Sequence, residues 1–202
     1  LSGDLLWSNI NYDEVKERFK TQLESSEVPY RASLALLARG LNLVYPLVDL
    51  EWKKGKKLYK NMMIDTIKYI EARRNKSSNY DAMKSIVCGE SLPLVWKNAD
   101  ESGAKISAFI AATTKSAYDV SQLSLKSNSI TKIRTQVAEI YVAYFQAVHA
   151  FGMEYDPQLQ TYETKITNLF KQLTNSLTKL CQESSLNLWD NDTGIPQSFF
   201  DL

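Results

Sequence analysis

The chain has 202 residues, of which 44% are hydrophobic and 23% charged, and this ordinary globular balance excludes a fibrous or wholly disordered protein. Its formal net charge is only +1 and its isoelectric point about 7.8, below the values above about 9 that mark dedicated nucleic-acid-binding domains. With 7 glycines and 5 prolines there are few helix breakers, so the composition favours an all-α fold.

Two cysteines, Cys88 and Cys181, are too few to form a disulfide framework in a chain of this length. We expect both to be buried, reduced thiols, which favours a reducing compartment and predicts a cytoplasmic location. The first residues lack the basic and apolar regions of a signal peptide, and no uninterrupted apolar run reaches the roughly 18 residues of a membrane span. We therefore expect no membrane association.

The first two expected helices differ in how much of their surface is apolar. Residues 11–25 begin with Asn11 and Glu14, which resemble a capping box, and carry apolar side chains along one face. Residues 30–52 are apolar nearly all round, so this segment should be the central helix. Pro46 lacks a backbone N–H, and we expect it to kink or end that helix.

The next three expected helices are separated by breakers. Residues 57–74 follow the charged turn KKGKK and end before the polar run NKSSN. A short helix at 80–89 should stop at Gly89, because glycine readily adopts the backbone conformation of a C-cap. Another short helix at 92–102 should carry Pro93 in its first turn.

The C-terminal half is expected to hold three longer helices. Residues 103–123 are rich in alanine, which lets a neighbouring backbone approach closely. Residues 130–151 should end at Gly152, and an Asp-Pro pair at 156–157 should open a final helix at 158–181. Apolar residues recur at spacings of three and four in the last two helices, and the short link between them predicts an antiparallel hairpin.

Together these elements predict an all-α, single-domain bundle of about seven to eight helices with a long antiparallel C-terminal helical hairpin. Residues 1–182 should form the helical body, and residues 183–202 an irregular, acidic and aromatic tail. The apolar seam of the hairpin fits internal packing and dimerisation equally well, so monomer and homodimer both stay open.

The sequence offers little catalytic chemistry. Three and four positions from the only histidine, His149, the residues are aromatic, amide, glycine and methionine, and none could share a metal or a proton with it. We expect a partly buried imidazole among aromatic rings that makes a hydrogen bond. With no metal-ligand spacing and no phosphate loop, we predict no enzyme activity and no catalytic residue, cofactor or metal. An active site around His149, Glu139 and Tyr144 is the remaining enzyme hypothesis.

A basic segment is the first candidate binding feature. Between Lys53 and Lys84 there are ten Lys or Arg and three acidic residues, a local charge of +7. Such a patch suits phosphates or an acidic protein surface. Its candidate partner-binding residues are Lys53, Lys54, Lys56, Lys57, Arg73 and Arg74.

The C-terminal tail is the second candidate binding feature. Residues 183–202 contain four acidic residues and no basic residue, together with aromatic side chains. Disordered segments hold few aromatics, so the tail should either fold back onto the body or present an acidic, aromatic surface to a partner. Its candidate partner-binding residues are Trp189, Asp190, Asp192, Phe199, Phe200 and Asp201.

Three stretches between residues 30 and 148 carry a family resemblance. They are YRASLALLARGLNLVYPLV, the pair MIDTIKYIEARRN and YDAMKSIVCGE, and the alanine-rich ADESGAKISAFIAATTKSAYDV. In the order of the segments and in their pattern of residue types they resemble the helical bacterial immunity proteins, the cognate inhibitors encoded beside polymorphic and contact-dependent toxins. No functional residue of that family carries over, because each immunity protein binds its own toxin through its own surface.

The resemblance implies a non-enzymatic, cytoplasmic binding protein whose partner is a cognate protein toxin. Stoichiometric binding would occlude the active site of the toxin or block its assembly, and a complementary charged face would speed capture. Nucleic acid is not the expected partner under this reading. The alternative is a nucleic-acid-associated or regulatory helical protein that uses the basic segment at residues 53–84.

Overall fold

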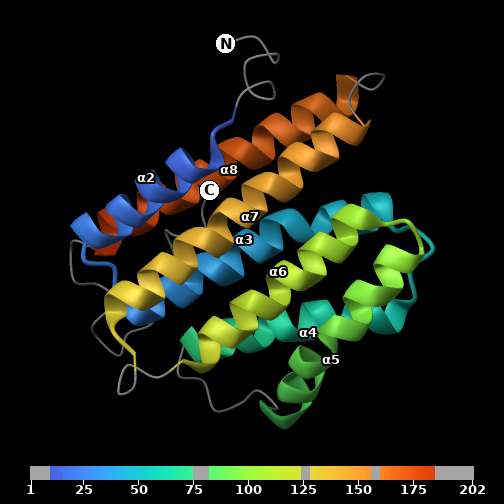
Figure 1. The fold of residues 1–202 in the computed structure, drawn as a ribbon, viewed down its shortest axis with the longest axis horizontal. Coiled ribbons are helices and arrows are strands. Elements are labelled where there is room, and N and C mark those ends of the chain that lie inside the picture. Colours follow the sequence, from blue (N-terminus) through green and yellow to red (C-terminus); the bar gives the residue numbers. More distant parts are fainter. Residues whose placement is uncertain (1–9, 75–81, 124–127, 156–159, 185–202) are drawn as a thin grey trace.

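The computed structural model of this chain describes residues 10–74, 82–123, 128–155 and 160–184. These residues form seven α-helices and no strand, which confirms the predicted all-α, single-domain fold (Figure 1). The helices are α2 (Tyr12–Ser25), α3 (Tyr30–Glu51), α4 (Lys57–Arg74), α5 (Ala82–Glu101), α6 (Lys105–Gln122), α7 (Ile130–Tyr155) and α8 (Gln160–Ser184). The Asp-Pro pair at 156–157 and, beyond the end of α8, the predicted tail lie outside the described residues.

Helix α3 is the centre of the fold, as its nearly continuous apolar surface predicts. It packs against α4 and α6 on one side and against α7 and α8 on the other (Figure 1). Its buried residues include Leu34, Leu37, Leu41 and Val44. Among the described helices, α3 alone is long and apolar enough to cross a membrane, and 61% of its most apolar window is buried inside the fold.

Pro46 does not end α3, which continues to Glu51. The missing N–H of Pro46 would have donated to the carbonyl of Asn42. Both residues are exposed, so water can satisfy that carbonyl without a partner from the protein. The helix therefore tolerates proline on its solvent side.

One helix stands where two short helices were predicted between residues 80 and 102. Helix α5 contains both Gly89 and Pro93, so neither residue marks a boundary. Gly89 has a packing role instead, because a Cβ there would lie 2.7 Å from the ring of Tyr118 in α6. Leu92 and Val95 are fully buried in the same helix, and their burial favours continuation across the proline.

The predicted C-terminal hairpin is confirmed, with α7 and α8 packed side by side (Figure 1). Helix α7 runs past Gly152 to Tyr155, so the predicted end at this glycine is wrong. Gly152 is buried, and the rings of Phe151 and Tyr155, four residues apart, stack with centroids 4.5 Å apart. This contact within one face of the helix stabilises the extra turn.

An aromatic cluster joins α2 to the hairpin. Phe19 of α2 contacts Tyr141 and Phe145 of α7, with ring centroids 5.6 and 5.3 Å apart, and Phe170 of α8 lies 5.1 Å from Phe145. The buried hydroxyl of Tyr141 donates to the carbonyl of Leu173 at 2.7 Å, so its polar end is satisfied. The cluster fixes α2 across the two long helices.

Both cysteines are buried and form no disulfide, as the sequence predicted. Cys181 lies in α8, where its thiol donates to the carbonyl of Gln22 in α2 at 3.7 Å. Burial raises the pKa of the Cys181 thiol, which keeps it protonated and unreactive.

Candidate functional site

The lysine turn, residues 52–57, joins α3 to α4 and is held by an aromatic stack. Trp52 is 7% exposed and stacks on Tyr59, with ring centroids 6.1 Å apart and planes within 9° of parallel. The N–H of Gly55 donates to the carbonyl of Trp52 at 2.9 Å, and a Cβ at Gly55 would lie 2.4 Å from Trp52 Cδ2. Only glycine fits against this ring, so the turn has one well-defined shape.

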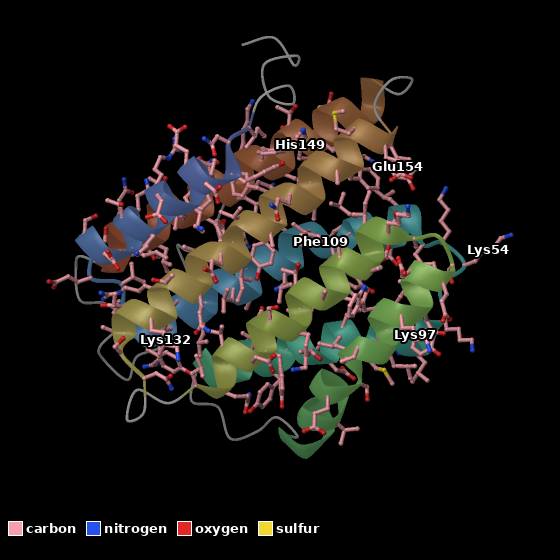
Figure 2. The ribbon with its side chains drawn as sticks, viewed as in Figure 1. Lys54, Lys97, Phe109, Lys132, His149 and Glu154 are labelled. Carbon is pink, nitrogen blue, oxygen red and sulfur yellow. The ribbon has the colours of Figure 1, made fainter. Side chains whose placement is uncertain are left out.

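This turn displays four of the predicted binding residues. All four are exposed: Lys53, Lys54, Lys56 and Lys57. Figure 2 shows Lys54 projecting from the edge of the molecule. The carboxylate of Asp49 is engaged by Lys60 at 2.7 Å, and no carboxylate in the described part of the chain forms an ion pair with the four lysines. The turn is therefore a rigid site of concentrated positive charge.

Glu51, immediately before the lysine turn, caps the N-terminus of α6. Its Oε1 accepts from the N–H of Ile106 at 3.1 Å, and its Oε2 accepts from the N–H and the hydroxyl of Ser107, each at 2.6 Å. A carboxylate in this position also opposes the positive end of the helix dipole. The cap anchors the start of the lysine turn to a core helix.

Arg73 and Arg74 are not near the lysine turn. They end α4, whose first residue is Lys57, and a rise of 1.5 Å per residue places them about 25 Å further along the helix. The basic segment is thus split between the two ends of α4, and the side chains of both arginines lie outside the described part. The tail candidates also lie outside it: Trp189, Asp190, Asp192, Phe199, Phe200 and Asp201.

His149 is partly buried and hydrogen-bonds through Nδ1 with the hydroxyl of Tyr12, as expected of an imidazole among aromatic rings. Burial raises the pKa of Tyr12 to about 12. Tyr144 and Glu139 do not join this pair. Tyr144, five residues before His149, is turned about 140° around the helix, and Glu139, ten residues before it, is turned about 80° and lies about 15 Å further along. Tyr144 is fully buried and donates to Leu37, whereas Glu139 is exposed. The three residues of the enzyme hypothesis therefore point apart.

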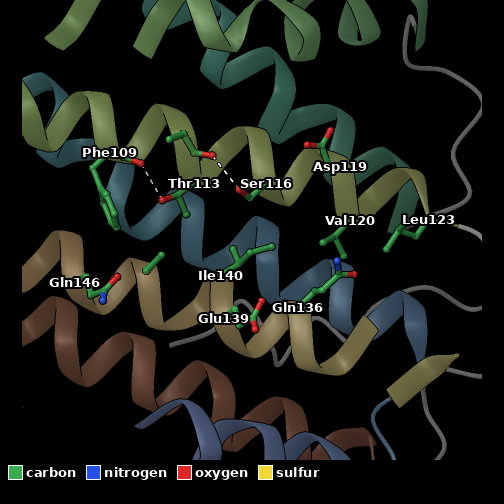
Figure 3. A pocket seen from close by; sticks show the side chains of 12 residues that line it. Phe109, Thr113, Ser116, Asp119, Val120, Leu123, Gln136, Glu139, Ile140 and Gln146 are labelled. Atoms are coloured by element: carbon green, nitrogen blue, oxygen red, sulfur yellow. Dashed lines mark hydrogen bonds between the residues drawn. The ribbon is translucent and has the colours of Figure 1, made fainter. Parts of the chain in front are cut away.

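A groove between α6 and α7 was not predicted from the sequence. Two adjoining cavities, of about 470 and about 600 Å³, share Phe109 and Gln146 among their lining residues. In Figure 3 the first cavity lies between the two antiparallel helices, with Phe109 and Gln146 at one end and Leu123 and Gln136 at the other. Its residues are mostly small or polar, which sequence patterns cannot distinguish from an ordinary solvated face.

The hydroxyls in this groove bond to their own helix. Thr113 donates to the carbonyl of Phe109 at 2.9 Å, and Ser116 donates to the carbonyl of Ala112 at 3.2 Å (Figure 3). Asp119 pairs with Lys115 one turn earlier. Both hydroxyls and the carboxylate of Asp119 therefore have partners within α6 itself.

Within the described ranges no three His, Cys, Asp or Glu side chains cluster closely enough to hold a metal ion. Comparison of the chain with protein-family models, with curated proteins and with solved structures returned no match.

Proposed function

We propose that this protein is a stoichiometric binding protein that neutralises a cognate bacterial toxin and docks on it through the lysine turn. The observation that carries the proposal is the exposure of four lysines, Lys53, Lys54, Lys56 and Lys57, on a turn fixed by Trp52, Gly55 and Tyr59. The order of helical segments that resembles immunity proteins supplies the class of partner.

A fixed turn suits tight binding because little backbone freedom remains to be lost when a partner docks. Concentrated positive charge favours an acidic region on the partner, and it accelerates encounter at low salt. An acidic region at or beside the active site of the toxin would be covered by the lysine turn and the adjoining end of α3. The inhibitor then acts by occupying space, with one copy for each toxin.

Nucleic acid is the second candidate partner, and the same four lysines favour it. Four phosphate contacts on duplex DNA would give an affinity that falls with salt with a logarithmic slope of about −3.6. A single protein partner in place of nucleic acid would exclude this alternative as the main function.

The first experiment is expression of the tagged protein with its neighbouring reading frame, followed by capture and a salt wash. The proposal expects one protein at equal molar ratio, and that protein should stop growth when it is expressed without the inhibitor. Recovery of nucleic acid that leaves with salt, or of a partner that is harmless alone, would overturn it.

A further inference from the structure

A continuous outer face of α6 and α7 follows the heptad spacing of helices that pack against other helices. Its residues recur at alternating steps of four and three, and each is at least partly exposed. On α6 they are Lys105, Phe109, Ala112, Ser116 and Asp119. On α7 they are Lys132, Gln136, Glu139, Ala143, Gln146, Ala150 and Met153, with Glu154 beside the last.

The charges at the four corners of this outer face alternate in sign. Helix α6 carries Lys105 at its start and Asp119 near its end, and α7 carries Lys132 at its start and Glu154 near its end. The helices are antiparallel, so Lys105 and Glu154 line the same cavity at one end of the groove. Figure 2 shows Lys132 and Glu154 at opposite ends of α7.

We propose that this outer face pairs with the same face of a second copy of the chain, about a two-fold axis in the plane of contact. This axis runs across the two helices, so α6 packs antiparallel on α6 of the second copy and α7 packs antiparallel on α7 of the second copy. Lys132 then meets Glu154 of the second copy, and Lys105 meets Asp119 of the second copy. The midpoints of these two pairs of positions are Ala143 and Ala112, so the smallest side chains lie at the axis, where the helices approach most closely.

The positive and negative charges of this face pair with one another when the face is rotated onto a second copy of itself. Binding to an unrelated protein would not require that property, so a second copy is the partner that the charge pattern favours. Each two-fold contact uses the same charges twice, as symmetric interfaces require. Asp119 keeps an exposed side chain although it pairs with Lys115, so it can accept a second ammonium group.

Apolar contact would accompany these charge pairs. Phe109 is 38% and Met153 is 62% exposed, and the second copy would cover both. The groove cavity of about 470 Å³ leaves room for the ring of Phe109 to enter from the opposite copy. Two helices of this length side by side offer about 600 Å² per copy, approaching the roughly 800 Å² of a standard interface.

The lysine turn is not part of the outer face, so each copy of the dimer would keep its own turn exposed. This inference therefore does not depend on the proposed function. A dimer that neutralised a toxin would carry two toxin molecules.

Sedimentation velocity over a series of protein concentrations tests the pairing with a charge swap. Lys132→Glu and Glu154→Lys each place like charges together at both ends, and each should weaken the dimer at least about tenfold. The double variant Lys132→Glu/Glu154→Lys restores opposite charges, so it should recover most of the affinity. Lys97 and Glu101 form a similar pair on α5. Lys97→Glu, Glu101→Lys and their double variant are therefore matched controls that should leave self-association unchanged.

Circular dichroism establishes that each variant keeps the helix content of the wild type. A wild-type protein that stays monomeric at every concentration would overturn the proposal. So would single reversals with no effect, or a folded double variant that stays as weak as the single variants.

Discussion

Gly40 lies in α3 against the ring of Tyr144, where the usual preference of helices for alanine should be reversed. A Cβ at Gly40 would lie 2.2 Å from Tyr144 Cε2 and 3.0 Å from Tyr141 Cε2. Tyr144 is fully buried, and its hydroxyl donates to Leu37 at 2.9 Å, so the ring has little room to move. Close packing of the two helices therefore depends on a missing side chain.

Gly40→Ala should lower the free energy of unfolding by about 1–3 kcal/mol through overpacking. At an uncrowded helix position the same substitution would raise it by about 1 kcal/mol. Urea denaturation of the two proteins measures the difference. An unchanged or more stable variant would show that the Tyr144 ring yields at low cost.

Two partly buried tyrosines predict how stability depends on alkaline pH. Burial raises the pKa of Tyr12 to about 12, and burial together with the charge of Asp49 raises the pKa of Tyr45 to about 12. In the unfolded chain a tyrosine ionises near about pH 10, so above that pH the unfolded state binds fewer protons than the folded state. Their contribution to stability is fully present below about pH 10 and is lost as the pH rises through about 12.

Tyr45→Phe removes one of these groups and should make the alkaline loss of stability smaller than in the wild type. Urea denaturation at about pH 8 and about pH 11 gives the loss for each protein. Equal losses in the two proteins would mean that Tyr45 ionises as readily in the folded state as in the unfolded one.

At the scale of elements, the contact between the end of α3 and the start of α6 depends on Glu51. Glu51→Ala removes three accepted hydrogen bonds and should lower the free energy of unfolding by about 1–2 kcal/mol. Glu51→Gln keeps one accepting oxygen and should cost less. Thermal or urea unfolding of both variants checks this order.

Asp49→Ala is the control for the Glu51 variants, because it removes a neighbouring carboxylate whose ion pair with Lys60 is half exposed. Its cost should stay within about 1 kcal/mol, as for other surface pairs. If Asp49→Ala costs as much as Glu51→Ala, the effect belongs to the loss of negative charge near the lysine turn rather than to the cap.

The sequence correctly predicted the helices whose capping residues and apolar pattern agree with the way they pack in the fold. Asn11 caps α2 by accepting from the N–H of Glu14 at 3.3 Å, and α3 is the central helix. The wrong predictions of helix ends concern glycine and proline, which interrupt a helix when no tertiary contact supports it. Gly89 and Pro93 lie within α5, because packing against α4 and α6 buries side chains on both sides of them. Local rules carry no information on that burial.

The binding surfaces of the whole molecule could be predicted only in part. The four lysines follow directly from the charge of residues 53–57, and the separation of Arg73 and Arg74 from them was already implied by the predicted helix at 57–74. The groove could not be predicted, because its two walls are 13 or more residues apart in the sequence and come together only when α6 pairs with α7. The alternating charges at the corners of the outer face can be recognised as a pattern only after the pairing of α6 with α7 is known.

If the protein neutralises a partner by docking through the lysine turn, two variants with matched net charge should differ in their affinity for that partner. The first replaces Lys53, Lys54, Lys56 and Lys57 with glutamine. The second replaces four exposed lysines elsewhere and has the same net charge: Lys68, Lys97, Lys165 and Lys171.

The most direct measurement is calorimetric titration of the captured protein partner with the wild type and with each of these two variants. We predict one binding site per copy, and a loss of affinity of at least about tenfold in the lysine-turn variant. The control variant should bind like the wild type. Equal affinity of all three proteins, or an equal loss in both variants, would contradict the assignment of the lysine turn as the docking surface.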